Sequence, residues 1–321
     1  MEKPKNKLAL LFPGQGSQFV GMGADLYQEF TEARAIYALA DEVLGFKLSK
    51  LCFEGPEEEL NDTANTQPAI YVTTWALWEA LGPSLAEVEE RVAFAAGHSL
   101  GEFCALAAVG ALAFTDGLQL VRLRGEAMRD AGAERPGGMA AIIGLDDQAV
   151  AEVVAAANGE GQRVWIANYN SPGQVVIAGE REALEQALAL AKARGAKRTV
   201  PLAVSVACHT PLMAAAGERL AKALEETCIL RPWVPVVSNA LARPLTEPEE
   251  IRAALLRQLT SPVRWVESVQ AMIQGGARTM LEIGPRSVLA GLVKRISAEV
   301  TVQAVTDVPS LGALRWEEAG A

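Results

Sequence analysis

The stretch from Val92 to Val109, VAFAAGHSLGEFCALAAV, decides the fold. A short apolar run, Val92 to Ala96, meets Gly97-His98-Ser99-Leu100-Gly101 and is followed by a second apolar run rich in Ala and Leu. This order predicts a strand, a tight turn and a helix, with Ser99 on a nucleophile elbow. The flanking glycines relieve the crowding of backbone against backbone in so sharp a turn. The Ser99 hydroxyl would then project beyond the sheet, at the positive end of the following helix.

The composition limits the classes of protein to which the chain can belong. Its 321 residues are 50% hydrophobic, which is enough for one large domain or two of ordinary size. The formal net charge of −10 argues against general binding to nucleic acid or to an anionic membrane, because either needs a positive surface. Pro13 and Gly14 cut the first apolar run short, so neither a signal peptide nor a membrane span fits. We therefore expect a cytoplasmic protein.

Cysteine and histidine are scarce. The 4 cysteines lie far apart without a Cys-x-x-Cys spacing, and 2 histidines cannot form a His-rich metal site. We expect reduced thiols and no bound metal.

The N-terminal third of the chain predicts alternating strands and helices. Lys7 to Phe12 (KLALLF) is typical of a strand, and it runs into Pro13–Gln18 (PGQGSQ), a turn too rich in glycine to be helix or sheet. Open α/β folds place their sites in loops at the carboxyl ends of strands, although an ordinary strand-to-helix turn explains this loop equally well. Helical spacing follows from Glu29 to Leu44, and Gln67-Pro68 is expected to open an apolar helix through Trp78. Gln67 therefore has a plain explanation as a helix-start residue.

A different pattern begins near Gly138. The predicted elements are a strand at 139–144, a helix at 146–157, strands at 164–170 and 175–179, a helix at 181–194 and a strand at 198–204. This β-α-β-β-α-β order is the split βαβ arrangement of ferredoxin-like units. We expect residues 137–205 to form a small subdomain inserted into a large α/β subdomain of residues 1–136 and 206–321. The tail beyond Val302 shows no clear pattern.

The candidate base for Ser99 follows by elimination. A serine hydroxyl is a weak nucleophile at neutral pH and usually needs a neighbouring base, most often histidine. Of the 2 histidines, His98 adjoins Ser99, and adjacent side chains diverge in a tight elbow, so its ring should not reach the hydroxyl. His209, in the loop SVACHTPLM, is left as the base; by itself it is more typical of a structural loop histidine, and the need for a base without a rival reverses that preference.

No acidic residue presents itself as the third member of a triad. A backbone carbonyl can accept the same imidazole N–H, but it stabilises an imidazolium less than a carboxylate would. That weaker arrangement suffices when the leaving group is a thiolate, because a thiol is far more acidic than an alcohol or an amine. The pattern therefore favours thioester chemistry.

Arg124 is the second unusual residue. It lies in a predicted amphipathic helix from Thr115 to Arg129, and the residues three and four positions away are all apolar. A guanidinium without a local acid, held against apolar surface, favours a bidentate anion such as a carboxylate. The plainer alternatives are an arginine that reaches water along the surface or one that pairs across the core. Arg122, by contrast, has Glu126 at i+4 and predicts an ordinary surface pair.

Together these residues resemble one enzyme family. The segments that carry the resemblance are FPGQGSQ (12–18), GHSLGE (97–102), Arg124-Gly125, NSPGQ (170–174) and His209. This ordered set is similar to the malonyl-CoA:acyl-carrier-protein transacylases over nearly the whole chain, and to the acyltransferase domains of polyketide synthases, which share these signatures. The resemblance implies an α/β-hydrolase-like large subdomain with a parallel sheet, carrying a ferredoxin-like small subdomain.

The resemblance also implies roles for individual residues. Ser99 would form the acyl-enzyme, and His209 would act as general base and then as general acid. The backbone N–H groups of Gln15 and Leu100 would form the oxyanion hole. Arg124 would hold the free carboxylate of a malonyl group.

Further positions are assigned by the same resemblance. The main-chain carbonyl of Gln258 would orient the histidine, and Gln67, Asn170 and His98 would line the pocket. Cys208 departs from the family pattern, because related enzymes often carry serine before the histidine. This departure bears on the choice of acyl group rather than on the chemistry.

The implied reaction is a ping-pong transfer for fatty acid synthesis. Malonyl passes from malonyl-CoA to the serine and then to the phosphopantetheine thiol of acyl carrier protein, with no metal or redox cofactor. The alternatives are a free-standing acyltransferase that serves a polyketide synthase, and a serine esterase or thioesterase that releases the acyl group to water.

An acidic carrier protein would require a local basic patch on this acidic chain. Two sets of side chains are candidates: Lys192, Arg194, Lys197 and Arg198, and Arg286, Lys294 and Arg295. Solvated helix ends are the plainer explanation of both sets.

Overall fold

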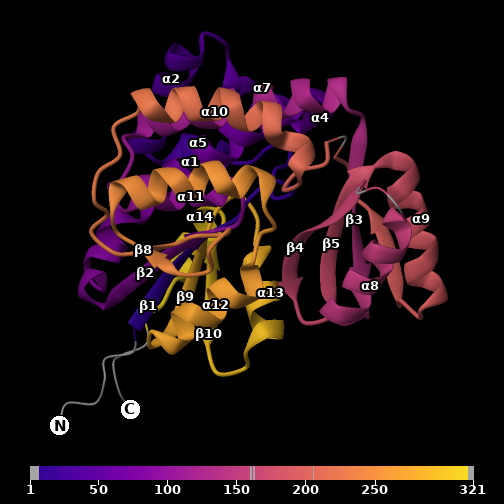
Figure 1. Ribbon diagram of the computed structural model, residues 1–321. Coiled ribbons are helices and arrows are strands. Elements are labelled where there is room, and N and C mark those ends of the chain that lie inside the picture. Colours follow the sequence, from indigo (N-terminus) through magenta and orange to yellow (C-terminus); the bar gives the residue numbers. More distant parts are fainter. Residues whose placement is uncertain (1–6, 160, 162, 205, 317–321) are drawn as a thin grey trace.

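The chain folds around two β-sheets, which lie side by side in Figure 1. The computed structural model describes residues 7–159, 161, 163–204 and 206–316. A 6-stranded sheet has the order β10-β9-β1-β2-β7-β8, and a 4-stranded sheet has the order β4-β5-β3-β6. The predicted fold class, an α/β-hydrolase-like subdomain with a ferredoxin-like insert, is confirmed.

The larger sheet is parallel apart from β8, which pairs antiparallel with β7 at one edge. Alternate residues of β1 belong to two different cores: Leu8, Leu10 and Phe12 to one, Ala9 and Leu11 to the other. Both faces of this central strand are therefore covered, which is why it reads as a continuous apolar run. Its strands are β1 (Lys7–Phe12), β2 (Val92–Gly97), β7 (Val236–Val237), β8 (Pro244–Leu245), β9 (Ala277–Ile283) and β10 (Thr301–Val305).

Helices cover both faces of this sheet (Figure 1). One core packs β1 against α2, α5, α6 and α7, and the other packs it against α12 and α13. The helices and short 3₁₀ turns of this part are α1 (Ala24–Glu29), α2 (Thr31–Leu44), α3 (Leu48–Glu54), α4 (Glu57–Asn61), α5 (Thr63–Ala86), η1 (Glu89–Arg91), α6 (Gly101–Ala108), α7 (Phe114–Glu134), η2 (Pro211–Met213), α10 (Ala214–Glu226), α11 (Pro248–Thr260), α12 (Trp265–Gln274), α13 (Leu289–Ile296) and α14 (Val308–Ala313).

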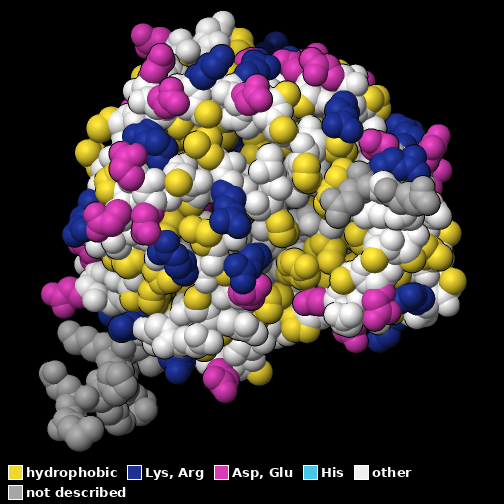
Figure 2. All heavy atoms as spheres, in the orientation of Figure 1, with side chains coloured by type: hydrophobic (Ala, Val, Ile, Leu, Met, Phe, Trp, Pro, Cys, Tyr) yellow, Lys and Arg dark blue, Asp and Glu magenta, His cyan; other side chains and the backbone are white. Residues whose placement is uncertain are grey.

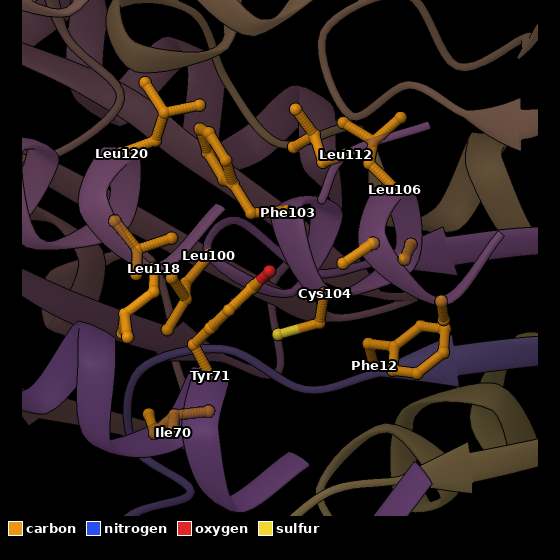
Figure 3. Packing of buried hydrophobic residues seen from close by; sticks show 14 of the residues in the cluster. Phe12, Ile70, Tyr71, Leu100, Phe103, Cys104, Leu106, Leu112, Leu118 and Leu120 are labelled. Carbon is orange, nitrogen blue, oxygen red and sulfur yellow. The ribbon is translucent and has the colours of Figure 1, made fainter. Parts of the chain in front are cut away.

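Helix α6 lies at the centre of the larger core. All of its residues are buried, and Figure 3 shows Phe103 near Leu120 of α7 and Cys104 beside Tyr71 of α5. The helix presents no face to solvent, and even its one charged residue, Glu102, is buried. This enclosure fixes the position of the turn that precedes α6.

Helix α5 begins four residues earlier than the sequence predicts, at Thr63 rather than at Gln67. The Asp62 side chain accepts a hydrogen bond from Ala64 N and caps the helix start. Pro68 has no N–H to donate to the carbonyl of Ala64, and Arg122 Nη1 donates to that carbonyl instead, at 3.0 Å. A tertiary contact thus allows proline inside the helix, and Gln67 is not a helix-start residue.

The helix predicted from Glu29 to Leu44 begins at Thr31, because Phe30 is extended and separates α1 from α2. The unassigned tail contributes β10, which pairs with β9 at the sheet edge.

The smaller sheet is antiparallel throughout and carries α8 and α9 (Figure 1). Its elements are β3 (Gly137–Ile143), α8 (Asp147–Asn158), β4 (Val164–Ser171), β5 (Gln174–Glu180), α9 (Arg181–Ala193) and β6 (Arg198–Pro201). Strand β6 ends at Pro201 rather than at Val204 as predicted; it is an edge strand that pairs only with β3 among the described residues. Residue 205, the last of the predicted insert, lies outside the described residues, and the exact division into subdomains stays a prediction.

Backbone hydrogen bonds join β4 of the smaller sheet to the segment that precedes α12. Tyr169 N, in β4, donates to Val263 O at 2.9 Å, and Val263 N donates to Ala167 O at 2.8 Å. Val263 precedes α12, so the edge of the smaller sheet is fixed against the larger subdomain. The side chains at the carboxyl end of β2 therefore face a defined wall.

Candidate active site

The turn between β2 and α6 is as sharp as its glycines predict. A Cβ on Gly97 would lie 1.8 Å from the backbone carbon of Gly101, and one on Gly101 would lie 2.0 Å from Phe12 O. No side chain fits at either position. Ser99, between them, has φ 54, in the left-handed region that residues other than glycine rarely adopt. The sharp turn places the Ser99 hydroxyl beyond the carboxyl end of the sheet.

Asn239 holds this strained turn from the neighbouring strand. Its side-chain Oδ1 accepts a hydrogen bond from Ser99 N at 2.6 Å, and its Nδ2 donates to Gly97 O at 2.6 Å. Asn239 lies two residues after β7, which is paired with β2. Because Ser99 N is engaged in this way, it is not available to bind a ligand oxygen.

Ser99 and His209 lie in direct contact. The Ser99 Oγ is 2.8 Å from His209 Nε2, and His209 Nδ1 lies 2.9 Å from the main-chain carbonyl of Gln258. Since a carbonyl only accepts, Nδ1 carries the proton, and the lone pair of Nε2 faces the serine hydroxyl. This is the arrangement a general base requires.

Burial keeps His209 neutral. The residue is 3% exposed, and burial, followed by the positive charge of Arg124, lowers the pKa of His209 to about 3. His209 also has a positive φ of 61. Both members of the pair therefore occupy strained backbone, which is typical of groups held in place for function.

Arg124 lies behind Ser99 rather than on the cavity surface. It is 1% exposed, and its guanidinium donates to Ser99 Oγ at 3.2 Å, to Gln67 Oε1 at 2.8 Å and to Gln258 Oε1 at 3.0 Å. All three acceptors are neutral, so no carboxylate contacts the guanidinium directly in these hydrogen bonds. Its Nε is buried without a hydrogen-bond partner among the described residues. Burial lowers the pKa of Arg124 to about 10, so it stays cationic at neutral pH and can bind an anion.

A cavity of about 260 Å³ opens in front of Ser99. Ser99, His98 and His209 lie at its base, and its walls come mostly from the smaller sheet and from the start of α13. The wall residues are Met139, Ala141, Asn168, Asn170, Gln174, Val176, Leu202, Val204, Val288, Leu289 and Leu292. Gln67, predicted to line the pocket, instead contacts Arg124 behind it.

Two backbone N–H groups beside Ser99 are free to bind an oxygen. Within the part of the chain that the structure describes, Gln15 N and Leu100 N donate no hydrogen bond. Gly14 brings the first of them close, since a Cβ on Gly14 would lie 2.3 Å from His98 O. Leu100 N lies at the N-terminus of α6, where the helix dipole favours negative charge.

His98 points away from the serine and joins the two subdomains. Its Nε2 is 2.9 Å from Oδ1 of Asn170, a residue of β4, and its ring packs edge-on against Trp265. Burial lowers the pKa of His98, so it too is neutral at neutral pH. Of the three residues predicted to line the pocket, His98 and Asn170 line the cavity and Gln67 does not.

The surface carries no single dominant charge on the face in view. Figure 2 shows Lys and Arg side chains interspersed with Asp and Glu, and hydrophobic side chains gathered where β4 and α13 meet. Arg194 pairs with Glu152 at 2.5 Å, and the Arg286 guanidinium lies 5.0 Å from the centre of the Phe19 ring. The predicted basic patches stay a prediction.

Comparison with known proteins decides the family. The model of the acyl transferase domain family matches residues 9–320. The chain is 46% identical over 308 residues to the malonyl CoA-acyl carrier protein transacylase of Haemophilus influenzae, covering 96% of this chain and 98% of that protein. The chain belongs to the malonyl-CoA:acyl-carrier-protein transacylase family.

Solved structures agree with this membership. The acyl-carrier-protein S-malonyltransferase of Bartonella henselae is 41% identical, with a TM-score of 0.92, and the match covers 96% of this chain and 98% of that one. A malonyl-transacylase in complex with a type II polyketide synthase acyl-carrier protein is 44% identical, with a TM-score of 0.90, over 96% of this chain and 98% of that one. The transacylase fold therefore extends over almost the whole chain.

Sequence reasoning missed two residues of the site. Asn239 was not singled out, although a polar residue just after a strand next to β2 is a recognisable signal. Glu102 appeared only as part of a motif, yet it is a buried carboxyl that contacts Gln258.

Among the described residues, no group of 3 or more His, Cys, Asp or Glu side chains is placed to hold a metal ion. None of the described helices is both long and apolar enough to span a membrane.

Proposed function

We propose that this transacylase moves the malonyl group from malonyl-CoA to the phosphopantetheine thiol of acyl carrier protein, through an ester on Ser99. The observation that carries the proposal is the convergence of two different groups on Ser99 Oγ: His209 Nε2 at 2.8 Å and Arg124 Nη2 at 3.2 Å. A malonyl group has its free carboxylate one CH₂ away from the thioester carbonyl. A base beside the Ser99 hydroxyl can activate it for attack on the thioester carbonyl, and a cation beside the same oxygen can bind the nearby malonyl carboxylate.

The first half-reaction acylates the enzyme. Neutral His209 takes the proton of the Ser99 hydroxyl as the oxygen attacks the thioester carbonyl of malonyl-CoA. The carbonyl oxygen becomes negative and is stabilised by the N–H groups of Gln15 and Leu100. The C–S bond breaks, and the imidazolium gives its proton to the leaving thiolate, so coenzyme A departs as a thiol.

Arg124 selects the acyl group in this step. Its guanidinium is already directed at Ser99 Oγ, and its charge is not neutralised by a directly bonded carboxylate. Binding the malonyl carboxylate at this distance from the nucleophile holds the thioester carbonyl next to Ser99. An acetyl group offers nothing to the guanidinium, so its thioester leaves a buried cation unpaired.

The second half-reaction reverses the first with a different thiol. The carrier-protein thiol gives its proton to His209 and attacks the Ser99 ester, and Ser99 regains the proton as the ester bond breaks. The main-chain carbonyl of Gln258 holds the imidazole in one tautomer throughout. Because it is neutral, it stabilises the imidazolium only modestly, which suffices between thiols.

Two alternatives lead to different products. Transfer to a polyketide carrier protein is the second candidate, supported by similarity to the transacylase bound to a type II polyketide synthase carrier. A hydrolase would pass the malonyl group to water. The apolar walls of the cavity, among them Val176, Leu202 and Leu292, disfavour water beside the ester and so favour transfer. A cytoplasmic location and independence from cofactors stay predictions.

Product analysis tests the proposal. The protein is incubated with malonyl-CoA and a carrier protein bearing phosphopantetheine, and malonyl-carrier and free malonate are quantified together. We expect malonyl-carrier to form much faster than malonate. Malonate as the main product would show a hydrolase instead. Carrier proteins from fatty acid and polyketide systems, compared side by side, distinguish the two transfer candidates.

A further inference from the structure

We propose that Glu102 is a positioning residue for this active site and that it acts through the side-chain amide of Gln258. The inference rests on the proposed function, because it names a further residue behind the same nucleophile. Glu102 lies in the first turn of α6, three positions after Ser99, and is 2% exposed. It is not among the residues that line the cavity, and its carboxyl faces Gln258 and Asn239.

The hydrogen-bond partners of the Gln258 side chain allow its amide only one orientation. Gln258 Oε1 faces Arg124 Nη2 at 3.0 Å, and a guanidinium can only donate. Gln258 Nε2 faces Glu102 Oε2 at 2.8 Å and the main-chain carbonyl of Ser99 at 3.0 Å, and both of these accept. A reversed amide would place N–H against N–H and oxygen against two oxygens.

Glu102 therefore determines which end of the Gln258 amide faces the Arg124 guanidinium. By accepting from Nε2, it keeps Oε1 of Gln258 directed at the guanidinium. Without that acceptor, the Gln258 amide has only the Ser99 carbonyl on its donor side and can rotate. Arg124 would then lose one of the acceptors that fix its position beside Ser99 Oγ.

The same carboxyl oxygen holds a second support of the nucleophile. The main-chain N–H of Asn239 donates to Glu102 Oε2 at 3.2 Å, and the Asn239 side chain binds Ser99 N and Gly97 O. The N–H and the carbonyl of Ser99 are thus each held by an amide side chain, and both amide residues bind Glu102. This arrangement stabilises the strained backbone at Ser99.

The accepting oxygen, rather than the negative charge, carries the role. Burial raises the pKa of Glu102 to about 7, so a fraction of the molecules carry the protonated form near neutral pH. A protonated carboxyl still presents a carbonyl oxygen to Gln258 and Asn239. Glutamine at position 102 presents the same oxygen without any charge.

Two substitutions show whether Glu102 acts as a hydrogen-bond acceptor or only fills space in the core. Glu102→Met keeps the shape of the side chain but removes the acceptor, and Glu102→Gln keeps the acceptor. We expect Glu102→Met to lower kcat/KM for malonyl-CoA about ten- to a hundredfold, the range given by leaving a buried hydrogen-bond donor unsatisfied. We expect acetyl-CoA turnover to change far less, so the preference for malonyl falls. Glu102→Gln should stay within about fivefold of the parent.

A double-mutant cycle tests the path through Gln258. Gln258→Ala removes the amide but retains the main-chain carbonyl that binds His209, so the base stays oriented. In that background Glu102→Met should cause little further loss of malonyl preference. Glu126→Met, which alters a glutamate on the outer side of α7, is the matched control and should leave both rates unchanged. Thermal unfolding of each variant identifies any that fails to fold.

Three results would overturn the inference: unchanged malonyl preference in a folded Glu102→Met variant, an equal loss in Glu102→Gln, or full additivity with Gln258→Ala. If Glu102→Met does not fold, the Glu102→Gln rates and Gln258→Ala still decide it, because Gln258→Ala alone must lower malonyl preference. Failure of the proposed function looks different. In that case the parent protein itself would not transfer malonyl to a carrier thiol, whatever stands at position 102.

Discussion

The base of the cavity and its walls are built on different principles. The base belongs to the larger subdomain, and its side chains are fixed by short hydrogen bonds among Ser99, His209, Arg124 and Gln258. The walls come mainly from the smaller sheet and present apolar side chains such as Val176. Chemistry requires fixed polar groups, whereas enclosure requires only shape. Changes at the base should therefore affect rate and selectivity strongly, and changes at the walls should affect substrate binding mildly.

The largest effect is expected at the base of the cavity, from His209→Ala. Without His209, no other described side chain is placed to take the Ser99 proton, so kcat for transfer should fall about a thousandfold or more. Steady-state transfer to carrier protein measures it. Cys208→Ser, at the neighbouring position, is the control and should retain activity because the Cys208 thiol, whose pKa burial raises to about 11, takes no part in proton transfer. A modest loss in His209→Ala would mean that another base serves Ser99.

The next effect concerns selectivity. Arg124→Ala should lower kcat/KM for malonyl-CoA about a hundredfold, because the proposed contact to the malonyl carboxylate is lost, and should leave acetyl-CoA nearly unaffected. Competition between the two thioesters gives the ratio directly. Arg129→Ala, an exposed arginine of the same helix, is the matched control. Equal malonyl preference in Arg124→Ala and the parent would contradict the carboxylate contact.

A smaller effect is expected where base and wall meet. Asn170→Ala removes the hydrogen bond between His98 and β4, which joins the two subdomains inside the cavity. KM for malonyl-CoA should rise about fivefold with little change in kcat, because one neutral hydrogen bond is lost away from the reacting atoms. Initial rates over a range of malonyl-CoA concentrations separate the two constants. A large fall in kcat would place Asn170 with the chemistry instead.

The smallest effect is expected from pH. The free histidine pKa is about 6.5, and burial lowers that of His209 to about 3, so the base stays neutral well below neutral pH. The single-turnover rate of Ser99 acylation should therefore show no loss centred near pH 6.5 and should fall only at much lower pH. An acid limb near 6.5 would show that solvent reaches His209.

The same shift has the opposite consequence for stability. The unfolded chain takes up a proton at His209 below about pH 6.5, whereas the folded chain does not until about pH 3. The stability that His209 contributes is thus complete above pH 6.5 and falls as the pH decreases towards 3. As the pH falls below 6.5, the free energy of unfolding should therefore decrease while the acylation rate stays unchanged until much lower pH.

Local patterns in the sequence predict the elbow and the base. Gly97 and Gly101 are needed because backbone approaches backbone there, and that requirement is written in the motif itself. The scarcity of histidine leads to His209, which lies 110 positions away but has no rival. The neutral acceptor behind it also follows from the absence of a suitable acid. These are features that a single segment or a count reveals.

Long-range contacts could not be predicted in the same way. Asn239 binds the Ser99 N–H from 140 positions away, and Gln258 meets Glu102 from 156 positions away. The position of Asn239 after a strand marks it as a candidate site residue, but no pattern near Asn239 or Gln258 indicates which residue either of them binds. The start of α5 was misplaced for a related reason, because Arg122 supplies the hydrogen bond that Pro68 cannot.

One measurement tests the central claim most directly: the mass of the protein after brief exposure to malonyl-CoA, with peptide mapping of the modified residue. The account predicts one malonyl group, on the peptide that contains Ser99, and its complete transfer when carrier protein bearing phosphopantetheine is added. Ser99→Ala should take up none. A malonyl group on another residue, or an adduct on Ser99 that the carrier thiol cannot remove, would contradict the account.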